Sequence, residues 1–134
     1  MRKILTASSL VILLFLVACA SNTKTILRGC YQSEREGIGY VVVISFQQDN
    51  GGFIEYIDNR EVDRGTYEKI KDNVYEIKSD KQNLEVTLNA KNSFDIIIKK
   101  LNNGKSIQLK NVSDAPVEFS TRFNDVDKYK ALLE

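Results

Sequence analysis

The feature that most constrains the fold is a succession of short β-type runs separated by short polar turns. Between residues 26 and 112 there is no helical pattern long enough to cross between parallel strands, which need connections of a dozen residues or more. Neighbouring strands should therefore pair antiparallel. We predict an all-β domain, a single antiparallel meander of about eight strands closed into a small barrel or sandwich, with a short C-terminal helix.

The predicted strands follow the β-branched and alternating apolar residues. The run 38–46 is rich in Val and Ile and should form a central strand. In 84–88 apolar residues alternate with Glu85 and Thr87, so Val86 should point inward, as should Ile96 on the next strand. The predicted strands span residues 26–32, 38–46, 53–57, 65–70, 74–78, 84–88, 94–98 and 107–109, with a further short one at 117–119.

Turn residues and a closing helix complete the predicted architecture. Residues 102–105, Asn-Asn-Gly-Lys, are typical of a type I′ hairpin, and residues 111–116 should break the strand pattern. Asn124 or Asp125 can cap a helix that packs over one end or face of the barrel. The apolar side of that helix holds Val126, Tyr129, Leu132 and Leu133.

The beginning of the chain has the layout of a secretory signal peptide. Arg2 and Lys3 precede an apolar or small run over residues 4–18, which is shorter than the ~20 residues of a bilayer span. Cys19 follows this run. The predicted organisation is a signal peptide over 1–18, a lipidated Cys19 with a tether over 19–25, and a β domain over 26–134.

The end of the leader, Leu16-Val17-Ala18-Cys19, resembles the lipobox of bacterial lipoproteins. In that class the bond before the Cys is cut and the Cys, diacylated, becomes the first residue. The resemblance implies a protein of the bacterial cell envelope, lipid-anchored through Cys19 to the cell membrane or the outer membrane and facing away from the cytoplasm. The alternative is an ordinary signal peptide that contains a Cys.

The amino-acid composition of the chain narrows the range of functions that it can have. The chain has 19 basic and 18 acidic residues, and two of the basic ones, Arg2 and Lys3, lie in the leader, so the remainder is slightly acidic. That balance opposes nucleic-acid binding. The chain has no His, which removes the Ser-His and Cys-His nucleophile pairs and the commonest zinc ligand. We expect no metal, no cofactor and no enzymatic activity.

Cysteine and carboxylate positions predict structural roles. If Cys19 carries lipid, Cys30 is the remaining thiol; it should be buried and inert, the alternative being an intermolecular disulfide. Acidic side chains that alternate with apolar ones should form a solvated outer face, and aspartates in or near turns should serve turn geometry. These residues are Glu55, Glu61, Glu68, Glu76 and Glu85, and Asp58, Asp63, Asp72 and Asp80.

The runs Gly65-Thr66-Tyr67, Asn73–Ile77 and Leu84–Leu88 together resemble the meander of small lipocalin-like bacterial lipoproteins. The resemblance implies a barrel that carries a small apolar ligand. True lipocalins have a Gly-x-Trp signature, and this chain has no Trp; Gly29-Cys30-Tyr31 lies where the signature would fall. Strands of five to seven residues lead us to expect an interior filled by the chain's own side chains.

Tyrosines on neighbouring strands are the candidate binding residues. Tyr40, Tyr56 and Tyr67 could form a recognition surface, because Tyr is enriched at interface hot spots. The predicted function is a membrane-anchored lipoprotein acting as an extracytoplasmic binding or immunity-type interaction module with a protein partner in the envelope. The alternative is a lipocalin-like carrier of a small apolar ligand.

Overall fold

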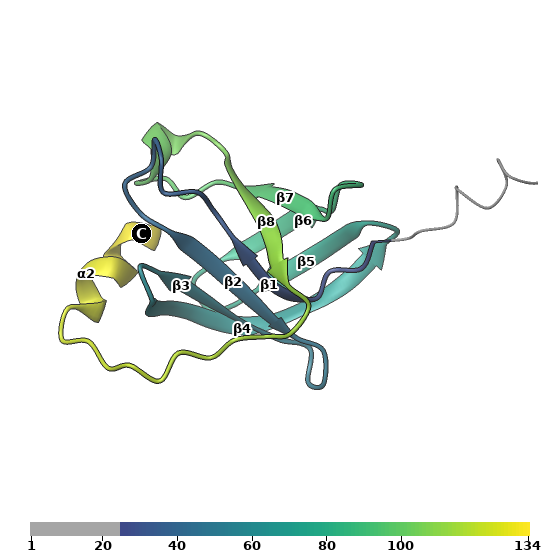
Figure 1. Ribbon diagram of the computed structural model, residues 1–134, viewed down its shortest axis with the longest axis horizontal. Coiled ribbons are helices and arrows are strands. Elements are labelled where there is room, and N and C mark those ends of the chain that lie inside the picture. The colour runs from purple at the N-terminus through teal and green to yellow at the C-terminus, as the bar shows by residue number, and fades with distance from the viewer. Residues whose placement is uncertain (1–24) are drawn as a thin grey trace, which may run out of the picture.

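The computed structural model, which describes residues 25–134, contains eight antiparallel strands in one sheet (Figure 1). The predicted signal peptide 1–18, the lipidation site Cys19 and the tether up to residue 24 lie outside the described residues. The strands are β1 (Gly29–Gln32), β2 (Val42–Gln47), β3 (Gly52–Ile57), β4 (Arg60–Lys71), β5 (Val74–Lys78), β6 (Asn83–Thr87), β7 (Ser93–Ile96) and β8 (Ile107–Ser113).

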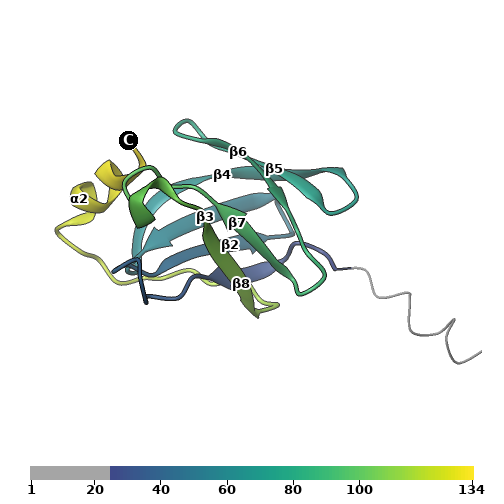
Figure 2. The same ribbon diagram turned by 90° about the horizontal axis from the view of Figure 1, so that it is seen from above.

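The strand order is β6-β5-β4-β3-β2-β1-β8-β7. Strands β1 to β6 therefore form a sequential meander, and the β7–β8 hairpin joins it through antiparallel pairing of β8 with β1. The two outermost strands, β6 and β7, come next to each other, so the sheet curls into a nearly closed barrel (Figure 2). This confirms the predicted all-β meander and decides for the barrel over the sandwich.

The barrel has two distinct ends because successive turns alternate between them. We call the end where the described chain begins at Thr25 the proximal end; the β2–β3, β4–β5 and β6–β7 turns lie there. The other connections and the C-terminal helix lie at the opposite, distal end (Figure 1). The distal end therefore lies opposite the end at which the described chain begins.

The barrel interior is filled by apolar side chains. Tyr31 packs edge-on against Phe46 with ring centroids 5.6 Å apart, and Phe94 lies 5.0 Å from Tyr31 and 6.1 Å from Phe46. Val86 and Ile96 are both buried in this core, as the alternating pattern predicts. The other buried members are Leu27, Val42, Ile44, Phe53, Ile57, Val62, Tyr75, Ile77, Leu88, Ile98, Leu101, Ile107 and Leu109.

The predicted hairpin at 102–105 is wrong in detail. Strand β7 ends at Ile96, and β8 begins only at Ile107. The connection instead contains a short 3-10 turn, η1 (Asn102–Gly104), with Asn102 and Asn103 at φ of 52° and 55°. Ile98 and Leu101 on this connection are buried in the core, so burying them competes with extending the hairpin.

Other boundaries also shift. The β1–β2 turn takes up the start of the predicted strand 38–46, including Tyr40. Strand β4 is longer than predicted because Asp58 and Asn59, both with positive φ, make a tight turn that lets pairing resume at Arg60. Strand β8 continues to Ser113 in its pairing with β1, and residues 117–119 form no strand.

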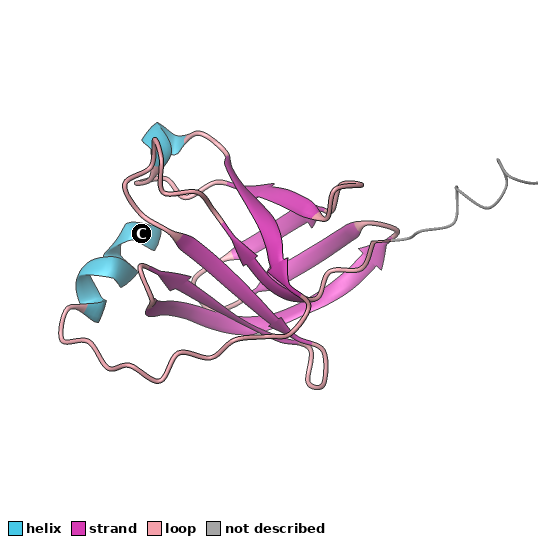
Figure 3. Ribbon diagram, viewed as in Figure 1, coloured by secondary structure: helices cyan, strands magenta, loops and turns pink. Residues whose placement is uncertain are grey.

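The C-terminal segment forms the predicted helix, α2 (Val126–Lys130), followed by a 3-10 turn, η2 (Ala131–Leu133). Asp125 lies at the N-cap position, but its carboxylate makes no capping bond. Tyr129, Leu132 and Leu133 pack against the barrel core. The helix itself lies at the distal end (Figure 3). The helix therefore covers that end of the barrel, as expected from its apolar side.

Candidate functional site

The three candidate tyrosines occupy three different environments. Tyr40 packs edge-on against Tyr129 of the C-terminal helix, with centroids 6.1 Å apart. Tyr67 is half-buried and packs on Phe46, 4.9 Å away. Tyr56 is 1% exposed and lies on the outer side of β3. They do not share one exposed surface, and their role in binding stays a prediction.

A segment that we call the strap, residues 114–123, crosses the outer face of the barrel (Figure 3). Two side chains of the sheet accept hydrogen bonds from its backbone. The Val117 N–H donates to Ser45 Oγ at 2.8 Å, and the Phe119 N–H donates to Tyr56 Oη at 3.2 Å. The Phe119 ring stacks edge-on against Tyr56, with centroids 4.7 Å apart. The strap is therefore fixed to the sheet without being a strand of it.

Beneath the strap lies a second, smaller apolar cluster on the outside of the barrel. Its buried members are Cys30, Val43, Ile54 and Tyr56, and Val117 of the strap packs on them. The Cys30 thiol is 4% exposed, and burial raises its pKa. This confirms the predicted burial of Cys30. Its low reactivity stays a prediction, based on the poor nucleophilicity of a protonated, covered thiol.

An open hollow of about 570 Å³ lies at the distal end, between the strap, the β3–β4 turn and α2. We call this hollow the distal groove. Tyr56, one of the three candidate tyrosines, forms part of its wall together with Phe119. The remaining lining residues are Asn59, Arg60, Glu61, Ser120, Thr121, Arg122, Phe123, Val126 and Lys130.

Arg60 holds the wall of the distal groove together. Its Nε and Nη2 donate to the two oxygens of Asp125 at 3.0 and 2.9 Å, and its Nη1 donates to the Asp58 carbonyl at 2.7 Å. The guanidinium also lies 3.9 Å from the centroid of the Phe123 ring. The hydrogen bonds from Arg60 lower the pKa of the Asp125 carboxyl, so the two-point contact persists into mildly acidic solution.

Within residues 25–134, the charged side chains that line the distal groove and form no ion pair are positive. Among residues 25–134, neither Arg122 nor Lys130 takes part in an ion pair, whereas Arg60 and Glu61 are both paired. Phe119 beside them is 39% exposed. Two available cations next to an exposed aromatic ring suit an acidic or aromatic group of a ligand.

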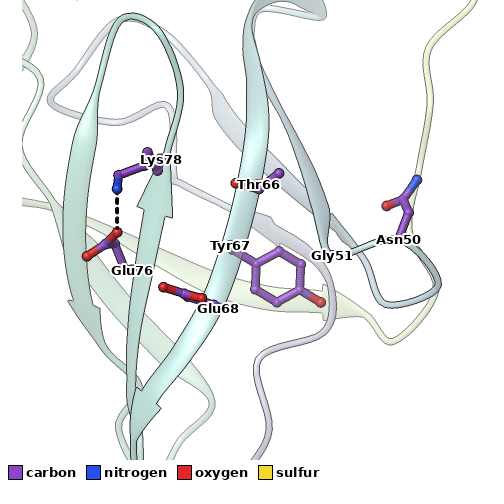
Figure 4. A pocket seen from close by; sticks show the side chains of 7 residues that line it. All are labelled: Asn50, Gly51, Thr66, Tyr67, Glu68, Glu76 and Lys78. Carbon is purple, nitrogen blue, oxygen red and sulfur yellow. Dashed lines mark ion pairs between the residues drawn. The ribbon is translucent and has the colours of Figure 1, made fainter.

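A smaller hollow of about 250 Å³ lies beside Tyr67 on the barrel wall (Figure 4). Two of its lining residues, Lys78 and Glu76 of β5, form an ion pair, with Nζ 3.2 Å from Oε1. Glu68, on the neighbouring strand, stands opposite Glu76 in the β4–β5 pairing. Because the cation of this hollow is already paired, we regard the hollow as a secondary candidate.

Inside the barrel lies a polar network that contradicts two predictions, the solvated outer position of Glu55 and the turn role of Asp63, which is instead a buried residue of β4. Glu55 of β3 is fully buried and stands opposite Asp63 of β4. Gln82 Nε2 donates to both, at 2.7 Å to Glu55 Oε2 and 2.7 Å to Asp63 Oδ2. Ser79 Oγ also donates to Asp63 Oδ2, at 2.6 Å. Within the part of the chain that the structure describes, Glu55 Oε1 has no hydrogen-bond partner.

Burial raises the pKa of Glu55 to about 7, opposed by the Gln82 hydrogen bond and reinforced by the Asp63 charge. The sequence did hold a signal for this inward position. Glu55 lies two residues from both Phe53 and Ile57, and a strand's period of two puts all three on one face. Because Glu55 is buried inside the barrel, its carboxyl group is placed to hold a proton there.

Comparison of the chain with protein-family models, curated proteins and solved structures finds no match in any of the three. Helices within residues 25–134 are all too short or too polar to cross a bilayer. The same residues contain no cluster of three or more acidic, Cys or His side chains arranged to hold a metal ion. The class that the fold defines is a nearly closed, eight-stranded antiparallel barrel with a C-terminal helix.

Proposed function

We propose that this protein is a lipoprotein, anchored in the bacterial envelope through Cys19, that works as a binding module for a protein partner. The leader pattern supports the anchor. The tether 19–25 is short, so it would hold the proximal end beside the lipid surface. The distal end would then face the space beyond the membrane.

The observation that carries the binding role is the distal groove. It lies at the end opposite Thr25. It combines Arg122 and Lys130, which form no ion pair within residues 25–134, with the exposed ring of Phe119. An acidic segment of a partner protein matches this chemistry. Anchoring would raise the local concentration of the groove at the membrane without changing any contact.

The alternative, a carrier of a small apolar ligand, has less support. Tyr31, Phe46 and Phe94 occupy the middle of the barrel with their rings in contact. An eight-stranded barrel is only just wide enough for its own side chains or one small ligand. Here the side chains take that space.

The lipid anchor is tested by Cys19→Ser. Wild-type protein grown with a tagged fatty acid should carry the label, and the variant should carry none, because the acylated thiol is missing. Cys30→Ser is the matched control: it removes a buried thiol and should leave labelling unchanged. Label retained by Cys19→Ser would refute the anchor.

The groove is tested by capture from envelope extracts. Arg122→Glu combined with Lys130→Glu should lower recovery of the specific partner about tenfold, because the groove then repels acidic groups. Lys71→Glu combined with Lys91→Glu makes the same change in net charge at the proximal end and should leave recovery near the wild-type level. Equal losses in both variants, or a small apolar molecule recovered in place of a protein, would contradict the proposal.

A further inference from the structure

The barrel is left open along one line, between β6 and β7, which we call the seam. These strands are the two ends of the sheet order, and each has a ladder on one side only. They come together at the proximal end, where Asn89 N–H donates to the Ser93 carbonyl at 2.9 Å. Figure 2 shows the strands separating beyond this turn. Within the described residues, no backbone hydrogen bond joins residues 83–87 to residues 93–96.

A hollow of about 270 Å³ lies in the open part of the seam, with residues of both strands on its walls. Ile97 is 58% exposed there, and Leu84 is only partly buried on the opposite side. Ile96 and Val86 form the floor toward the core. The seam thus offers unpaired strand edges beside a mostly apolar slot, the two elements that bind an added strand.

The charge around the seam is negative. Glu85 of β6 and Asp95 of β7 both line the hollow, one on each side. Glu85 also stands opposite Glu76, which stands opposite Glu68, so three carboxylates follow one another across β6, β5 and β4. Of these four acidic residues, Glu76 alone forms an ion pair within the described part of the chain, with Lys78. Like charges in direct register repel, and cations placed beside them would relieve the repulsion.

We propose that an extended, basic segment of a protein partner adds to the seam as a further strand. Its backbone pairs with the free edge of β6. Its Lys or Arg side chains lie on the outer face, beside Glu85, Asp95 and the exposed Ile97. Its alternate apolar side chains turn inward beside Leu84. This surface is separate from the distal groove and does not depend on it. The two surfaces select opposite charges.

A second copy of this chain fits the seam poorly. Glu85 is the middle residue of β6, so symmetric pairing of two β6 edges would place one Glu85 directly opposite the other. The charge that would attract a basic strand therefore also discourages edge-to-edge association of copies.

The test uses the full-length protein in detergent and a capped peptide of about six residues that alternates Lys and Val. The peptide should bind, and it should slow amide hydrogen exchange within residues 83–87. A peptide with the same side chains, N-methylated at alternate residues, should fail to bind because it has lost backbone donors. A Glu-Val peptide should also fail, because its charge is repelled.

Two matched variants separate local pairing from general attraction. Glu85→Lys should weaken binding of the Lys-Val peptide by about tenfold or more, whereas Glu68→Lys, the same change two strands away, should have a much smaller effect. Ile97→Ser should also weaken binding, and it removes an exposed side chain that the fold does not need. Absence of binding, equal loss in both charge variants, undiminished binding of the N-methylated peptide, or a dimer formed through β6 would each overturn the proposal. None of these results bears on capture by the distal groove.

Discussion

Val86→Asp is expected to lower the free energy of unfolding by about 4 kcal/mol. Val86 is 2% exposed and belongs to the core of the barrel. The substitution removes apolar contacts and leaves a carboxyl group without a hydrogen-bond partner among hydrocarbon side chains. Urea unfolding followed by circular dichroism measures the change, provided that the slope against denaturant stays constant.

The neighbouring residue supplies the control for this prediction. Glu85 is exposed on the opposite face of β6, so Glu85→Lys should change stability by no more than about 0.5 kcal/mol. It also ends the direct repulsion with Glu76. A larger loss for Glu85→Lys than for Val86→Asp would mean that the register of β6 is shifted by one residue.

Glu55→Gln is expected to stabilise the protein by roughly 3 kcal/mol above pH 8, and to change little near pH 4. Burial raises the pKa of Glu55 from 4.5 to about 7 in the folded protein. Between these values the folded state holds a proton that the unfolded state has released. The wild type therefore loses stability as the pH rises toward and through 7, and a neutral amide in place of the carboxyl removes that loss.

Unfolding free energies measured between pH 4 and pH 9 test this directly. The wild-type curve should fall across the interval, and the Glu55→Gln curve should be flatter. Glu85→Gln makes the same chemical change on the solvent face and should reproduce the wild-type curve. A wild-type stability that stays level from pH 5 to pH 8 would contradict a protonated Glu55 at neutral pH.

The meander could be predicted from sequence because each of its strands carries local information. In β6 and the residue after it, the alternation of Leu84, Val86 and Leu88 with Glu85 and Thr87 gives both the strand and the face that is buried. The Asp58-Asn59 turn is equally local, since both residues tolerate positive φ. For such elements the residues that determine the structure are neighbours along the chain.

The strap and the distal groove could not be predicted in this way. The alternation of Val117 and Phe119 predicted a short strand that does not form. The path of residues 114–123 depends instead on Ser45 and Tyr56, which lie far away in the sequence and accept hydrogen bonds from the strap. Arg60 meets Asp125 only when α2 has docked on the barrel. Glu55 was predictable only in part. The period of two along β3 places it on the same face as Phe53 and Ile57, whereas its charge led us to expect an outward position.

The sheet order has a consequence for how the barrel folds. Each ladder along the meander joins strands that follow one another in sequence, whereas β1 and β8 come from opposite ends of the barrel sequence. The side chain of Asn111 on β8 donates to the carbonyl of Cys30, 81 residues away, at 3.4 Å and to that of Arg28 at 3.2 Å. Closing a long loop costs chain entropy that a hairpin avoids, and folding slows as such contacts become more important. The hairpins should therefore form first, and the β1–β8 ladder should be among the last parts of the molecule to assemble.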